Sequence, residues 1–261
     1  MPLSQADDGQ SKVLTRPKAL QLLGAHIINL LHPLEEQYHP WSAKKFPKLD
    51  CPLLRVWDRC SGSQPKANGR MLARSPNQVL DTREARKTSL ASHLDHAAWN
   101  VPTPYISFTS SASVIKGLVP RRIEKRGNQI LTVIDPAVRL EKGLPILDVH
   151  AEMNHYSIPD PYNKGSRYYI NHYVCLWEVT LDEIVGHYSW EDLSRSANWY
   201  EEVIMPAFRE HRKAKIDTAP TRVSAFNMSK MMENLPSKFI TRRSMYLANC
   251  RRHKQAPRSE R

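Results

Sequence analysis

The chain has 261 residues, of which 41% are apolar and 25% charged, the composition of a globular protein with a core of its own. No run reaches the ~18–20 consecutive apolar residues that a membrane-spanning helix needs, and the first residues lack the basic-then-apolar layout of a secretory signal. Four cysteines without CxxC spacing argue against a disulfide scaffold, so we expect a cytoplasmic or nuclear protein with no membrane partner.

Positive charge is concentrated toward the carboxyl end of the chain. The net charge is +12, and residues 209–261 hold fourteen Lys and Arg against four Asp and Glu. We predict that this segment is a basic tail separate from the folded part, with Arg242-Arg243 and Arg251-Arg252 as its densest clusters. Such clusters bind phosphate backbones without reading sequence, and they also occur as solvated tails or nuclear-import signals. Nucleic acid or another polyanion is therefore a candidate partner of residues 209–261.

The region before residue 52 is predicted to hold little regular structure besides one helix. Residues 1–14 are polar and are expected to be disordered. Within 15–51, Thr15 suits a helix start, and apolar residues at helical spacing predict an amphipathic helix over Pro17–Leu31, followed by a proline-rich linker.

Residues 52–208 are predicted to form one α+β domain. Apolar or alternating runs predict strands at Pro52–Trp57, Tyr105–Thr109, Gln129–Ile134 and Tyr173–Thr180. Helical spacing predicts helices at Thr82–Ala98, at Ser111–Leu118 with a serine cap, and at Glu191–Arg212 with an interruption at Pro206. Residues 61–77 and 150–168 are predicted to be loops, and Asp182–Tyr188 a short turn or helix.

Several familiar chemical motifs are absent or incomplete. His150-Ala-Glu152 matches one half of a zinc-deaminase signature, but the P-C-x-x-C half is missing, so that site is excluded. His93 and His96 on a predicted helix would need His150, Glu152 and His155 from a distant loop to complete a metal site, and no short-range spacing links the two groups. We therefore predict no metal. P-loop, Rossmann and serine-hydrolase signatures are absent as well.

Three elements in a particular order carry a family resemblance over roughly residues 52–190. They are Arg55 on an early strand, the hydroxyl-bearing strand Tyr105–Ser110, and a later strand pair that leads into Val179–Gly186. In this order they resemble the ADP-ribosyltransferase fold of the cholera and heat-labile enterotoxin catalytic chains, and of related uncharacterised domains of filamentous fungi. The resemblance implies a split, strongly bent β-sheet with flanking helices, whose cleft holds NAD⁺ as a substrate.

The same resemblance implies roles for individual residues. Arg55 would bind a phosphate of NAD through bidentate geometry, Ser107 would orient neighbouring groups, and Thr109 would support the strand. The reaction also needs an anion beside the positive charge that develops at C1′ of the ribose. From the residues alone, Arg55 is equally consistent with an ion pair to Asp58.

The chain departs from this family at the catalytic position. Alignment on the segment that follows places His172 where the family carries its catalytic glutamate. A neutral imidazole can hydrogen-bond a ribose hydroxyl, but it holds no fixed negative charge. Glu152 in the preceding loop is a conceivable substitute, and the apolar run that precedes Glu178 argues against shifting the alignment to that residue.

Two functions of different classes follow. The leading hypothesis is an NAD-binding domain of ADP-ribosyltransferase type, either a transferase, an NAD glycohydrolase or a catalytically impaired pseudoenzyme. The alternative is a non-enzymatic interaction protein that binds nucleic acid or another polyanion through residues 209–261.

Overall fold

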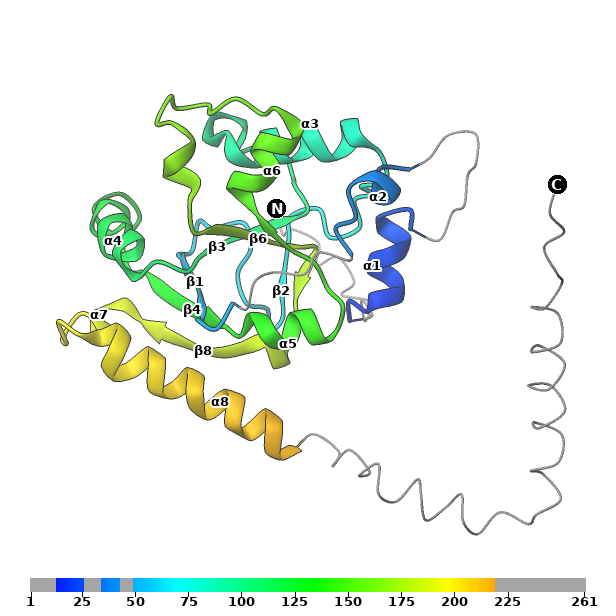
Figure 1. Ribbon diagram of the computed structural model, residues 1–261. Helices are drawn as coiled ribbons and strands as arrows, with labels where there is room; N and C mark the ends of the chain where they lie inside the picture. The colour runs from blue at the N-terminus through cyan, green and yellow to red at the C-terminus, as the bar shows by residue number, and fades with distance from the viewer. Residues whose placement is uncertain (1–12, 26–33, 43–48, 219–261) are drawn as a thin grey trace, which may run out of the picture. The chain divides into compact units, whose positions relative to one another are not determined.

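The computed structural model describes residues 13–25, 34–42 and 49–218, and its main element is a six-stranded antiparallel sheet (Figure 1). Across the sheet the strands follow the order β5 (Ile146–Asp148), β6 (His172–Leu176), β3 (Tyr105–Thr109), β1 (Leu53–Trp57), β4 (Ile130–Ile134) and β8 (Ile184–Ser189). Helices flank this sheet, which confirms the expected α+β class. Contacts divide the chain into one compact unit through Lys213 and a second from Ala214, and the following description concerns the first.

The sheet is weakly joined at its centre. β1 pairs with β4 over five positions, and β3 pairs with β6 over five, but β1 and β3 share the single ladder pair Leu54↔Thr109. Two well-paired halves therefore meet at one point.

A residue in a left-handed conformation separates β6 from a second, two-stranded sheet. Trp177 has a φ of 62°, and β7 (Glu178–Val179) follows it and pairs with β2 (Met71–Leu72). The Trp177 ring is fully buried, and its indole N–H donates to the Gln78 carbonyl at 2.9 Å. Because a bulky residue rarely adopts a positive φ, burial of the ring is what stabilises this turn. The single strand predicted over Tyr173–Thr180 is therefore two strands in different sheets.

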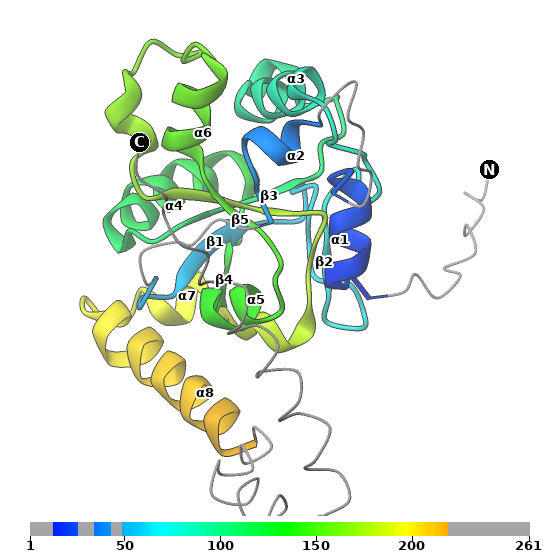
Figure 2. The ribbon, with the colours of Figure 1, turned by 45° about the vertical axis from the view of Figure 1, so that its right-hand side comes forward.

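One face of β3 and β6 is covered by helices from three parts of the chain. Helices α1 (Arg16–Leu22), α3 (Arg83–Leu94) and α6 (Val149–Tyr156) share an apolar cluster with these strands. Helix α2 (Glu35–Tyr38) joins α3 through Arg86, whose Nη2 donates to Glu36 at 2.6 Å, and Figure 2 shows α2, α3 and α6 on the same side of the sheet.

The other half of the sheet packs against later helices. Helices α4 (Ala112–Arg126) and α7 (Trp190–Leu193) share a second cluster with β1 and β4, together with the π-helical turn Tyr200–Ile204. Helix α5 (Pro136–Glu141) is anchored by fully buried Arg139, which donates to Glu183 at 2.9 Å and to three backbone carbonyls. Helix α8 (Met205–Thr218) follows the π-helical turn directly. Among the described helices, none is long and apolar enough to cross a membrane.

The sequence predicted where helices begin more accurately than where they end. The Ser111 hydroxyl accepts the Val114 N–H, so the predicted serine cap of α4 is confirmed. The helix nevertheless continues through Pro120 to Arg126 and ends before Gly127, which has a φ of 74°, rather than stopping at Leu118. Its last turns carry four basic residues, Arg121, Arg122, Lys125 and Arg126.

Other predictions of elements were wrong. Helix α1 ends at Leu22, and of the predicted continuation to Leu31, residues 26–31 lie outside the described part. Residues 150–156 belong to α6 rather than to a loop, because Asp148 caps that helix by accepting the Ala151 N–H.

The segment after β7 also differs from prediction. In place of a short turn or helix at Asp182–Tyr188, a 3-10 turn at Leu181–Glu183 leads into strand β8, which pairs with β4. Pro206 does not interrupt the helical run, because the π-helical turn Tyr200–Ile204 leads into α8 without a gap, and the break falls at residues 194–198 instead. Leu14, at the end of the terminus expected to be disordered, is buried.

Candidate functional site

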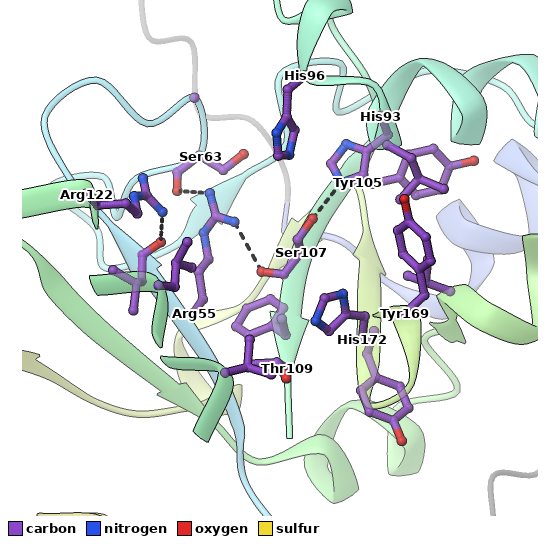
Figure 3. Close-up of a pocket in the computed structure, with 18 of the residues that line it drawn as sticks. Arg55, Ser63, His93, His96, Tyr105, Ser107, Thr109, Arg122, Tyr169 and His172 are labelled. Carbon is purple, nitrogen blue, oxygen red and sulfur yellow. Dashed lines mark hydrogen bonds between the residues drawn. The ribbon is translucent and has the colours of Figure 1, made fainter. Parts of the chain in front are cut away.

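A pocket of about 810 Å³ opens beside β3, and β1, β3 and β6 all contribute to its lining (Figure 3). The end of α3, helix α4 and the segment around residues 162–169 complete its walls. A volume of this size lies within the range of about 300–1,000 Å³ that is usual for small-molecule and cofactor sites.

The four residues predicted from sequence lie together in this pocket. Arg55 comes from β1, Ser107 and Thr109 from β3, and His172 from the first position of β6. Figure 3 shows Ser107 between Arg55 and His172. Residues separated by more than a hundred positions in the chain therefore line one cavity.

Arg55 is a cation without a carboxylate partner among the described residues. Its Nη1 donates to the Ser107 carbonyl at 3.1 Å and its Nη2 to the Ser63 carbonyl at 3.3 Å, while its buried Nε has no hydrogen-bond partner there. Desolvation lowers the pKa of Arg55 to about 10, so the group stays charged at neutral pH. Asp58, the ion-pair partner considered for it, pairs with Arg122 at 2.6 Å instead. A guanidinium held in this way is suited to bind an anion.

The Ser107 hydroxyl is held by a histidine. His93, in the last turn of α3, places Nε2 2.7 Å from Ser107 Oγ and Nδ1 2.8 Å from Thr103 Oγ1. Desolvation and then the charge of Arg55 lower the pKa of His93 to about 3, so the ring is neutral and one nitrogen donates while the other accepts. The sequence offered no signal for this contact, because it placed His93 on a predicted helix and gave it no partner on a strand.

His172 presents an uncharged ring to the pocket. Desolvation lowers its pKa, and its ring packs edge-on against Tyr168 and Tyr169, with centroid separations of 5.6 and 6.2 Å. Neither ring nitrogen makes a hydrogen bond within the described part of the chain. Thr109, its register partner on β3, is buried and accepts the Ser111 N–H, so this hydroxyl holds the start of α4.

The glutamates considered as substitutes lie elsewhere. Glu152 is fully buried in α6, where its Oε2 accepts the Trp41 indole N–H and lies 2.9 Å from His39 Nε2. Glu178 accepts hydrogen bonds from Arg70 and from the Leu14 N–H and lines a second, smaller cavity. Among the described residues that line the main pocket, none is a glutamate.

The two groups of possible metal ligands are held apart by different partners. His93 and His96 line the pocket, whereas His155 stacks on His39 with ring centroids 3.5 Å apart. In the described ranges, no group of three or more His, Cys, Asp or Glu side chains is arranged to hold a metal ion.

The densest basic clusters of the predicted tail, Arg242-Arg243 and Arg251-Arg252, lie outside the described residues. Binding of a polyanion by residues 209–261 therefore stays a prediction.

Comparison with known proteins identifies a family but no characterised relative. A family described as "Domain of unknown function (DUF7587)" matches residues 49–193, which is more than half of the chain and includes all four predicted site residues. Neither the curated proteins nor the solved structures contain a significant match.

Proposed function

The chain belongs to the family described as "Domain of unknown function (DUF7587)", and from its pocket we propose that it is an NAD-binding domain of ADP-ribosyltransferase type that lacks the usual catalytic carboxylate. One observation carries this proposal. Arg55, Ser107 and His172, chosen from their order in the sequence, line a single pocket of suitable volume. Had these side chains faced different cavities, the resemblance would have had no chemical meaning.

Each group has a role toward the dinucleotide. The Arg55 guanidinium, which has an unused Nε and no carboxylate partner in the described part, binds the pyrophosphate. Ser107, oriented by the neutral His93 ring, and His172 supply hydrogen bonds to ribose hydroxyls.

The same groups explain why the domain would cleave NAD slowly. Cleavage of the bond between nicotinamide and ribose develops positive charge at C1′, and a carboxylate normally stabilises it. Here His172 is neutral, and Arg55 raises the energy of a nearby cation instead of lowering it. The domain therefore binds NAD and cleaves it far more slowly than a transferase with a glutamate at this position.

Calorimetric titration with NAD tests the proposal. Removing a charged hydrogen-bond donor costs about 1.5–3 kcal/mol, so Arg55→Ala should weaken binding by about 10- to 150-fold. Arg195→Ala, at a side chain that is 72% exposed and remote in sequence from the pocket-lining residues, is the matched control and should bind as the wild type does. Absence of wild-type binding at millimolar NAD, or equal binding by Arg55→Ala, would end the proposal.

A further inference from the structure

The pocket carries more positive charge than a dinucleotide balances. Six cations line it, namely Arg55, Arg74, Arg121, Arg122, Lys125 and Arg126. Among the described lining residues the one acid is Asp95, and outside the lining Asp58 pairs with Arg122 and lies 3.8 Å from Arg126. With neutral His93 and His172, a net charge of about +4 remains, whereas the pyrophosphate of NAD supplies two negative charges.

Two of these cations are free to meet another ligand. Arg121 and Lys125 lie one turn apart on the exposed surface of α4, near its carboxyl end. Neither makes an ion pair or a side-chain hydrogen bond with any residue that the structure describes. Arg122, one position away, is instead occupied by Asp58 and by the Val56 carbonyl.

Exposed aromatic side chains line the same pocket. Trp99 is 74% exposed, Tyr168 54% and Tyr162 36%, and all three contribute to the lining. Large rings left in water beside cations are the pattern of single-strand nucleic-acid binding, in which bases stack on the rings and phosphates meet the cations. A base in a duplex is already stacked on its neighbours, so its faces do not reach a ring within a pocket.

We infer that the mouth of this pocket binds single-stranded nucleic acid, with backbone phosphates on Arg121 and Lys125 and a base stacked on Trp99. This goes beyond the proposed function, since the site does not require NAD and uses none of the basic residues after 218. An acidic peptide would satisfy the cations but would leave the exposed rings without a partner.

Fluorescence anisotropy with labelled dT10 and U10, measured on the full chain between 50 and 200 mM salt, tests the inference. Arg121→Ser/Lys125→Ser removes two phosphate contacts, so the slope of log K against log salt should become shallower by about 1.4. Trp99→Ala should weaken binding between about fivefold and about 150-fold. The matched control is Lys18→Ser/Lys213→Ser, at two exposed lysines outside this pocket. Its salt slope should stay closer to the wild-type slope than the slope of Arg121→Ser/Lys125→Ser does.

All substituted side chains are exposed, so the variants should unfold at the wild-type temperature, and this is checked first. An unchanged slope and affinity in the pocket variants, or an equal change in the control pair, would overturn the inference. Binding of a duplex as tightly as of the single strand would overturn it as well. So would equally tight binding of polyglutamate that is weakened by Trp99→Ala. Oligonucleotide binding without NAD binding would refute only the proposed function, and NAD binding without oligonucleotide binding would refute only this inference.

Discussion

Replacing His172 by glutamate is the perturbation that tests most directly why this pocket should turn over slowly. The residue occupies the first position of β6 and lines the pocket together with Arg55 and Ser107. Its imidazole is neutral because desolvation lowers its pKa. His172→Glu would therefore add a negative charge where the wild type has none.

The expected gain follows from electrostatics. A carboxylate about 4 Å from the charge that develops at C1′ contributes about 4 kcal/mol at an effective dielectric constant near 20, which corresponds to about 10³ in rate. Arg55 in the same pocket neutralises part of that charge, so a gain of about 10²–10³ in nicotinamide release is expected, similar to the loss when one preorganised electrostatic group is removed.

The assay compares nicotinamide release at saturating NAD for the wild type, His172→Glu and His172→Gln. Glutamine has the shape of glutamate without its charge, so it separates electrostatic stabilisation from a change in packing against Tyr168 and Tyr169. Calorimetry establishes that each variant still binds NAD. If glutamate and glutamine release nicotinamide at the same rate while both bind the dinucleotide, the electrostatic reasoning is wrong.

Three further outcomes follow from other parts of the structure. Arg139→Met should destabilise the protein by about 3–5 kcal/mol, because it leaves the buried carboxylate of Glu183 without its ion-pair partner. Arg195→Met removes an exposed ion pair and should cost about 0–1 kcal/mol. Equal urea midpoints for the two variants would contradict this. Folding lowers the pKa of His93 from 6.5 to about 3, so the protein should lose stability in acid. The contribution of His93 to the free energy of unfolding is complete above pH 6.5 and declines toward pH 3 by at most about 1.4 kcal/mol per pH unit. Thermal unfolding of His93→Asn should show a shallower decline with falling pH, and a decline parallel to that of the wild type would argue against a neutral His93. Deleting residues 219–261, which keeps α8, should weaken polyanion binding and reduce its salt dependence; identical binding by the truncated chain would exclude a role for the tail.

The sequence predicted local structure well where short-range signals were strong. Strands β1, β3 and β4 follow from apolar and β-branched runs, and the start of α4 follows from the Ser111 cap. Strand β8 was missed because its sequence, Ile184–Ser189, contains glycine and polar residues and becomes a strand through its pairing with β4. The division at Trp177 was missed for a related reason, since a left-handed tryptophan is stabilised by burial of its ring and not by local preference.

For the candidate site, the order of motifs along the chain was enough to select Arg55, Ser107, Thr109 and His172, and to show that no glutamate stands at the last position. The partners of these side chains became known only from the packing of the fold. It assigned Asp58 to Arg122 and so left Arg55 without that partner, and it brought His93 from α3 onto Ser107 of β3. Periodicity and capping act between neighbours in the chain, whereas the pairing of charges and hydroxyls depends on which distant segments pack together, and that is settled only when the core forms.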